Sequence, residues 1–137
     1  MLKLNIVIVY DKNEENILMC FRTKDPYKGL YNLVGGKIEA GETDLEGAYR
    51  ELEEETGITQ ADIILTRLMD FEYYMNEIEL QVFVGRLNKA VTLREEKHPL
   101  SWIDANSDFY DPQKYAGEGN IGHMVEQIKI HKDKVLK

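Results

Sequence analysis

Three glutamates, Glu51, Glu54 and Glu55, stand at positions i, i+3 and i+4 of one short segment. On an α-helix these positions are neighbours on one face, so the three carboxylates would form a compact cluster of oxygen atoms. Such clusters suit hard divalent cations, and Mg²⁺ keeps part of its water shell, which leaves room for the oxygens of a phosphate group. The spacing therefore favours a site for Mg²⁺ or Mn²⁺.

The segment that carries these glutamates is the most acidic part of the chain. Eight acids and one base, Arg50, lie between positions 39 and 55, a net charge of −7 against −8 for the whole chain. Like charges at this spacing repel one another unless a cation lies among them. A solvated helix face is the alternative interpretation, but the acids are not interleaved with lysines as they usually are on such faces. Arg50, four residues before Glu54, is placed to orient a carboxylate ligand.

A helix with defined ends would position this cluster. Thr43, with Glu46 three residues later, predicts a capping box at the helix start, and Gly57 suits the position just after the last helical residue. A narrow apolar stripe on this helix would pack on a sheet, and it consists of Leu45, Ala48 and Leu52.

The rest of the chain predicts a mixed sheet with helices packed on both faces, an α/β fold. Short β-branched and apolar runs between polar or glycine-containing turns favour strands. A second amphipathic helix is expected over 119–131, with its apolar face formed by Ile121, Met124, Val125 and Ile128. The expected strands cover 4–10, 16–22, 30–34, 61–75, 78–87 and 101–103.

The composition limits the classes of protein to which the chain could belong. A chain of 137 residues fits one domain, and 43% hydrophobic with 31% charged residues is typical of a globular protein. No apolar run approaches the roughly 20 residues of a membrane span, and the apolar N-terminus favours an opening strand rather than a signal peptide. An isoelectric point near 4.9 argues against a nucleic-acid polymer as partner. The single cysteine, Cys20, excludes an internal disulfide and fits a cytoplasmic location.

Residues 36–58 resemble the complete signature of the Nudix hydrolases. The fixed positions are Gly36, Glu42, the run Arg50-Glu51-Leu52-x-Glu54-Glu55, and Gly57-Ile58, and every one of them is matched. The resemblance implies an α/β/α sandwich with a mixed sheet and a loop-helix-loop catalytic motif, in one Nudix domain over 1–137. It also implies an enzyme that uses Mg²⁺ or Mn²⁺ to hydrolyse a pyrophosphate bond in a nucleoside derivative.

Carried over residue by residue, the resemblance assigns roles to the signature. Glu54 or Glu51 would be the general base, with Arg50 beside them in the catalytic group. Glu42 would stabilise the loop or reach the metal through water. A further glutamate outside the signature is expected near Trp102, where Glu96 is the first candidate and Glu95 the second, with an ordinary solvated acid as the alternative for each. The expected metal ligands are Glu51, Glu54, Glu55, Glu96 and the carbonyl of Gly36.

The string GGKIEAGET, residues 35–43, is similar to that of the MutT-type members, described as 8-oxo-dGTP diphosphatases. Val34 stands where many of those members have proline. Asn120 matches the region of a base-reading asparagine, and helix capping is its alternative role. Strand alternation places Phe71 and Tyr73 on one face and Tyr74 on the other, so at least one of these aromatics would belong to the core. The candidate substrate-binding residues are Arg22 and Lys37 for phosphate, and Asn120, Phe71 and Tyr73 for the base.

The resemblance thus implies a small nucleotide as partner, and the chain is expected to act as a monomer or homodimer. The leading hypothesis is hydrolysis of a nucleoside triphosphate, 8-oxo-dGTP or a related (d)NTP, to a monophosphate and pyrophosphate. The alternatives are ADP-ribose, a nucleotide sugar or a dinucleoside polyphosphate as substrate. A non-catalytic nucleotide sensor is a further alternative, but Glu51, Glu54 and Glu55 are all present, which favours an enzyme.

Overall fold

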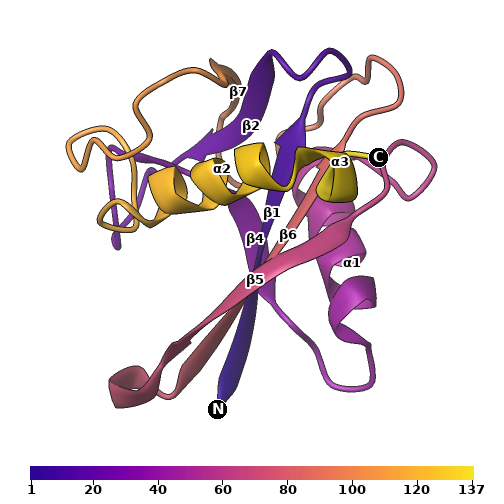
Figure 1. Ribbon diagram of the computed structural model, residues 1–137. Coiled ribbons are helices and arrows are strands. Elements are labelled where there is room, and N and C mark those ends of the chain that lie inside the picture. Colours follow the sequence, from indigo (N-terminus) through magenta and orange to yellow (C-terminus); the bar gives the residue numbers. More distant parts are fainter.

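β1 (Leu2–Tyr10) lies at the centre of a seven-stranded mixed sheet (Figure 1). The computed structural model describes all residues, 1–137. The other strands are β2 (Asn16–Phe21), β3 (Tyr31–Asn32), β4 (Val34–Lys37), β5 (Thr66–Tyr73), β6 (Ile78–Arg86) and β7 (Leu100–Asp104). The helices are α1 (Asp44–Thr56), α2 (Asn120–Ile130) and α3 (Lys132–Val135), and a 3₁₀ turn covers Tyr74–Asn76.

The strand order β3-β2-β1-β6-β5 is extended by β4, which pairs with β1, and by β7, which pairs with β2. β1 is parallel to β6 along its whole length and antiparallel to β4 over Leu4–Val7. Its last residue, Tyr10, pairs with Ile17 of β2. This arrangement places β4, which carries the glycine pair of the signature, directly beside the first half of β1.

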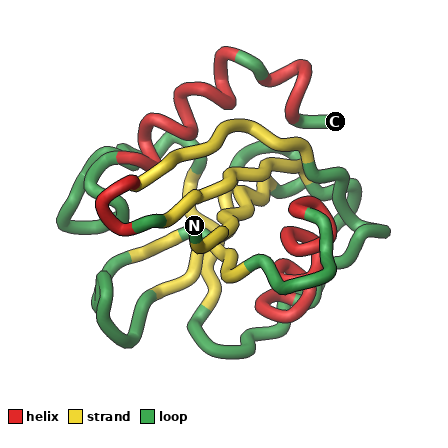
Figure 2. Tube along the Cα trace, turned by 90° about the horizontal axis from the view of Figure 1, so that it is seen from below, coloured by secondary structure: helices red, strands yellow, loops and turns green.

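The helices cover opposite faces of the sheet, and Figure 2 shows α2 and α3 on one side of the strands and α1 on the other. Side chains of β1 alternate between two cores, with Ile8 and Tyr10 under α2 and Val7 and Val9 under α1. Burial on both faces explains why this strand is a continuous apolar run instead of an alternating one. The predicted sandwich of a mixed sheet between helices is confirmed.

The start and end of α1 are as predicted. Thr43 Oγ1 accepts from the Glu46 backbone at 3.1 Å, Glu46 Oε1 accepts from the Thr43 backbone at 2.7 Å, and Gly57 is left-handed at φ +82°. The expected apolar stripe was partly wrong. Ala48 and Leu52 are fully buried, but Leu45 is 43% exposed because it lies in the first turn, where the buried face of the helix begins with Gly47.

Two strand predictions were also wrong in extent. The expected strand 30–34 is divided into β3 and β4, because the Leu33 backbone N–H donates to the Asn32 side chain at 2.8 Å and so leaves the sheet ladder. The expected strand 61–75 covers only Thr66–Tyr73. A turn closed by the Asp62 carboxylate, which accepts from the Thr59 backbone at 2.9 Å, precedes it.

The closing helix buries all four residues of its predicted apolar face. None of the three helices combines the length and the apolar character that crossing a membrane requires.

Candidate active site

Arg50 is at the centre of the signature segment. Its guanidinium donates to both oxygens of Glu42 at 2.9 Å, to Glu51 Oε1 and Glu54 Oε2 at 3.1 Å, and to the Lys37 carbonyl at 2.9 Å. These bonds join the loop after β4 to the outer face of α1. The paired hydrogen bonds from Arg50 lower the pKa of Glu42 to about 2, so this carboxylate is ionised at neutral pH.

Beside Arg50, four glutamates line one hollow of about 270 Å³. Its lining consists of Glu51, Glu54, Glu55, Glu96, Arg94 and Lys97. In this conformation no three acidic, histidine or cysteine side chains converge as a ready-made metal site. Glu51 and Glu54 instead each direct one oxygen to Arg50, and Arg50 contacts only that one oxygen of each carboxylate.

The contact between Gly36 and Glu51 shows how closely the loop approaches the helix. A methyl group on Gly36 would overlap the Glu51 carboxylate in its present position, so any larger residue there would require the end of this side chain to shift. The Gly36 backbone N–H donates to Asn5 Oδ1 at 3.0 Å, which fixes the strand beside the carboxylate. The Glu51 carboxylate beside the Gly36 backbone and the other glutamates of the hollow offer only oxygen donors, the type of ligand that Mg²⁺ and Mn²⁺ prefer.

Glu55 differs electrostatically from its neighbours. Burial, and secondly the charge of Glu51, raise its pKa to about 7. A buried carboxylate facing a second carboxylate is stabilised in its charged form by a cation between them. The position of Glu55 therefore also fits a divalent cation.

A larger cavity of about 760 Å³ adjoins this hollow, and Glu55 and Lys97 line both. Its apolar wall includes Leu4, Ile6, Ile78, Leu80, Ile121 and Met124, and its polar groups include Arg22, Tyr27, Tyr73, His98, Glu118 and Asn120. A cavity of this size, with an apolar wall and a few polar groups, is typical of sites for small organic ligands.

The structure brings most of the predicted site residues to these two spaces. Glu51, Glu54, Glu55 and Glu96 line the hollow, and Arg22, Gly36, Tyr73 and Asn120 line the cavity with Glu55. Glu95, the second candidate outside the signature, instead accepts from the Leu100 backbone at 2.8 Å.

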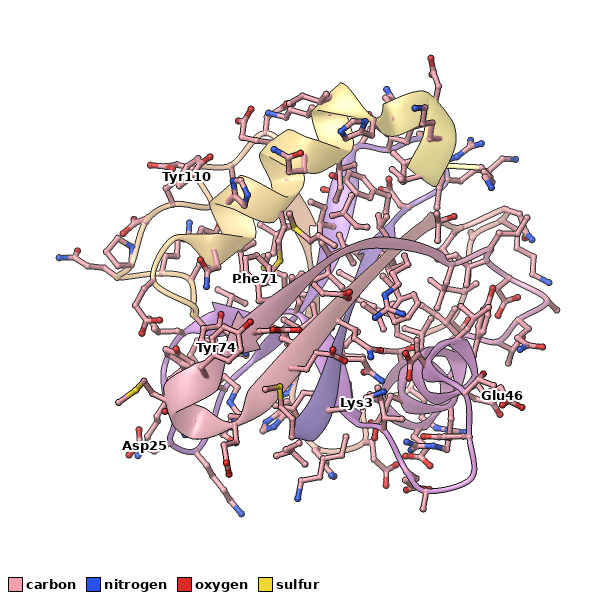
Figure 3. The ribbon with its side chains drawn as sticks, turned by 60° about the horizontal axis from the view of Figure 1, so that its bottom comes forward. Lys3, Asp25, Glu46, Phe71, Tyr74 and Tyr110 are labelled. Atoms are coloured by element: carbon pink, nitrogen blue, oxygen red, sulfur yellow. The ribbon has the colours of Figure 1, made fainter.

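Two predicted substrate-binding residues lie outside the cavity lining. Phe71 packs against the core under α2, and Figure 3 shows it on the side of β5 that faces this helix. Lys37 is exposed at the end of β4, where its carbonyl rather than its side chain contacts Arg50. Tyr74, on the 3₁₀ turn, is 74% exposed.

Two cavity residues, Tyr27 and Glu118, were not expected from the sequence, and neither was the contact between the predicted residues Tyr73 and Asn120. Tyr27 donates to both oxygens of Glu118 at 3.0 Å, which joins two loops that are 91 positions apart. Asn120 is not a helix cap, because Gly119 occupies that position, and its side chain donates to Tyr73 Oη at 3.0 Å. No local pattern could have identified these pairs, since each forms only when distant segments meet.

Comparison with known proteins agrees with the fold and the signature. Residues 3–118 match the model of the NUDIX domain family. The "8-oxo-dGTP diphosphatase" of Escherichia coli K12 is 31% identical over 117 residues, which cover 82% of this chain and 91% of that protein. The "ADP-ribose pyrophosphatase" of Methanocaldococcus jannaschii is 43% identical over 47 residues, which cover 34% of this chain and 28% of that protein.

Among solved structures, one from work on the MutT proteins of Aliivibrio salmonicida and Vibrio cholerae superposes with a TM-score of 0.73 at 21% identity. The superposition covers 94% of this chain and 98% of the other. The chain therefore belongs to the Nudix family, in which it is a pyrophosphohydrolase of the MutT type.

Proposed function

We propose that this protein uses Mg²⁺ or Mn²⁺ to hydrolyse a pyrophosphate bond in a nucleoside triphosphate, 8-oxo-dGTP or a related (d)NTP, and releases a nucleoside monophosphate and pyrophosphate. The proposal rests on one observation: Glu55 and Lys97 line both the glutamate hollow and the larger cavity, so the hollow and the cavity meet at these two residues. A nucleotide in the cavity would extend its phosphates into the hollow between these two side chains. The glutamates of the hollow are then beside the bond to be broken.

Glu51, Glu54, Glu55, Glu96 and the Gly36 carbonyl would hold the divalent cation. A cation held there would supply positive charge to phosphate oxygens and would make a nearby water molecule more acidic. Glu54 or Glu51 accepts the proton of the attacking water. Arg50 keeps these two carboxylates oriented, since it already contacts one oxygen of each.

The polar groups of the cavity form two sets, one suited to the phosphates of a nucleotide and the other to its base. Arg22 and Lys97 provide positive charge for the phosphates. Tyr73 and Asn120 supply an aromatic surface and an amide for the base, and their mutual hydrogen bond of 3.0 Å holds both in place. Lys37 and Phe71 have no part in this proposal, because neither lines the cavity.

ADP-ribose is a second candidate substrate. The Methanocaldococcus jannaschii protein, named as an ADP-ribose pyrophosphatase, shares 43% identity over 47 residues. The match to the Escherichia coli 8-oxo-dGTP diphosphatase is longer, at 117 residues, and this favours the triphosphate. Nucleotide sugars and dinucleoside polyphosphates contain the same pyrophosphate group and belong in the same test.

Product analysis distinguishes these substrates. The purified protein is incubated with Mg²⁺ and each of 8-oxo-dGTP, dGTP, ATP, ADP-ribose, a nucleotide sugar and a dinucleoside polyphosphate, and the products are separated by ion-exchange chromatography. The proposal expects the highest kcat/KM for a triphosphate, with monophosphate and pyrophosphate in equal amounts. Release of single phosphate groups, or a preference for ADP-ribose, would contradict it.

The expected setting is the cytoplasm, and the expected partner is the free nucleotide. Cys20 is a free, buried thiol and the single cysteine of the chain, which agrees with a protein that does not depend on an internal disulfide. The acidic composition, with a net charge of −8, disfavours binding to a nucleic-acid polymer.

A further inference from the structure

A groove of about 510 Å³ lies along the outer face of α1. Its walls come from α1, from residues 59–61 and from Arg94. Figure 3 shows Glu46, one of its lining residues, on the side of α1 that faces away from the strands. Glu54 and Arg94 line both this outer groove and the glutamate hollow, so the two spaces meet at these residues.

The hollow therefore connects the cavity with the outer groove. Glu55 and Lys97 lie where it meets the cavity, and Glu54 and Arg94 lie where it meets the outer groove. No hydrophobic residue lines the hollow, so its walls suit phosphate groups and not a nucleoside. With a nucleoside in the cavity, the phosphate chain would pass Lys97 first and would end toward Arg94.

Two arginines line the outer groove, and they differ in the hydrogen-bond donors that they can offer to a ligand. Arg50 makes five hydrogen bonds within the signature segment, and a guanidinium has five N–H groups, so none is left. Arg94 uses one N–H group, on Nη2, which donates to the Glu53 carbonyl at 3.2 Å. Its other N–H groups are available to the oxygens of an anion.

Arg94 is held at the end of α1, although it belongs to the loop after β6. Its backbone N–H donates to the Thr56 carbonyl at 2.9 Å, and its side chain contacts the Glu53 carbonyl. The last turn of α1 contains no basic residue of its own, so a cation here stabilises the negative end of the helix. This contact keeps the guanidinium beside the helix that carries the glutamates.

We propose that Arg94 binds the terminal phosphates of a nucleoside triphosphate, and that the pyrophosphate product leaves the hollow through the outer groove. This role of Arg94 rests on the proposed function, since it takes the nucleoside to lie in the cavity. The nucleoside monophosphate would remain on the cavity side, beside Lys97. ADP-ribose would present an uncharged ribose to Arg94 in place of a phosphate, so Arg94 would also favour triphosphates as substrates.

The test measures the two products separately. Isothermal titration calorimetry in the presence of Mg²⁺ gives the affinities for inorganic pyrophosphate and for dGMP, in the unaltered protein and in Arg94→Gln and Arg94→Lys. Lys129→Gln is the matched control, because it also removes one positive charge. Lys129 is exposed and lies on α2, on the opposite side of the sheet from α1 (Figure 2).

We expect Arg94→Gln to weaken pyrophosphate binding roughly tenfold, the effect of losing a hydrogen bond between charged groups at an exposed site. The affinity for dGMP should not change, because dGMP does not reach Arg94. Arg94→Lys should recover part of the loss, since it keeps the charge but not the forked donors. Lys129→Gln should change neither affinity.

Two results would refute the role of Arg94. The first is an unchanged affinity of Arg94→Gln for pyrophosphate. The second is an equal loss for pyrophosphate and dGMP, which would show that Arg94 acts only by holding the end of α1. An equal loss of pyrophosphate binding in Lys129→Gln would likewise show that net charge, and not this position, is responsible.

The binding measurement does not depend on turnover, so it separates this role from the proposed function. If the unaltered protein hydrolyses no triphosphate but binds pyrophosphate through Arg94, the proposed function fails and the pyrophosphate site stands. If it hydrolyses triphosphates and Arg94→Gln binds pyrophosphate normally, only the role of Arg94 fails. An unaltered protein that binds no pyrophosphate would refute this role whatever its activity.

Discussion

The hollow lined by four glutamates and the larger cavity adjoin each other, yet they are built in opposite ways. Of the four glutamates around the hollow, three come from one helix, α1, and Arg50 on the same helix orients two of them. The cavity draws its lining from strands β1 to β6, from the loops after β2 and β6 and before α2, from the end of α1 and from the first half of α2. Chemistry held on one rigid helix is fixed by local spacing, whereas a recognition surface shared among many segments depends on the whole fold.

This difference suggests a division of labour. Under the proposed function the hollow would set the rate of bond cleavage, because its carboxylates would lie next to the phosphates of the substrate. The cavity would set which nucleotide is held, through side chains such as Tyr73 and Asn120 that bond to each other. Substitutions in the two regions should therefore have different kinetic signatures.

The largest effect is expected from Glu54→Gln. Removing the charge removes a proposed cation ligand and a candidate base, so kcat should fall on the order of 10²- to 10⁴-fold, with the thermal midpoint unchanged within a few degrees. Glu53→Gln is the matched control, since Glu53 is a neighbouring exposed glutamate that does not line the hollow. Steady-state kinetics of both variants test the assignment, and equal rates in the two would contradict it.

Arg50→Met should have the next largest effect. The substitution leaves Glu42, Glu51 and Glu54 without their shared partner, so both Mn²⁺ affinity and kcat should fall roughly 10- to 100-fold. Arg50→Lys keeps the charge but cannot reproduce the forked hydrogen bonds, and it should recover only part of the loss. Full activity in Arg50→Lys would show that charge alone is sufficient at this position.

The same contrast explains how much could be predicted from the sequence. The helix with its capping box and the cluster of Glu51, Glu54 and Glu55 follow from contacts within a few residues, and such contacts are visible as spacing. Leu45 was assigned to the buried face because the apolar period does not show where the sheet ends. The division of strand 30–34 depends on one asparagine side chain that replaces a ladder bond.

For the cavity, the sequence indicated that aromatic side chains would contact the base, but it did not indicate which of these side chains reach the cavity. Phe71 and Tyr73 are two positions apart on one strand and were each a candidate for contact with the base. Their rings stack with centroids 6.5 Å apart, yet only Tyr73 lines the cavity, while Phe71 packs against the core under α2. The Tyr27–Glu118 contact depends on two loops whose paths only the folded chain defines. Long-range packing, which no single window of sequence contains, accounts for these residues.

A smaller effect, of a different kind, is expected in the cavity. Asn120→Ala removes an amide that supports Tyr73, and the loss of one such hydrogen bond should raise KM roughly fivefold with little change in kcat. Tyr74→Phe is the control, because Tyr74 is exposed and does not line the cavity. A fall in kcat without a change in KM would contradict the division between the two regions.

The smallest predicted effect concerns pH and is confined to the metal-free protein. Burial and the charge of Glu51 raise the pKa of Glu55 from 4.5 to about 7, so the folded chain keeps this proton to higher pH than the unfolded chain does. The free energy of unfolding should therefore fall as the pH rises from about 4.5 to above 7. Urea denaturation at several pH values in the presence of a chelator measures this slope.

Glu55→Gln is the control for this measurement, because an amide cannot ionise. In this variant the free energy of unfolding should not fall between about pH 4.5 and 7. At low pH it should equal that of the unaltered protein. If its pH profile matches that of the unaltered protein, Glu55 is not the titrating group.

The most direct test of the account is isothermal titration calorimetry with Mn²⁺, with and without a non-hydrolysable nucleoside triphosphate. The unaltered protein should take up Mn²⁺ saturably, more tightly with the nucleotide present, and Glu51→Gln and Glu54→Gln should each weaken this uptake strongly. Absence of uptake by the unaltered protein even with nucleotide would contradict the claim that these helix glutamates hold the cation, and so would uptake by either variant as tight as that of the unaltered protein.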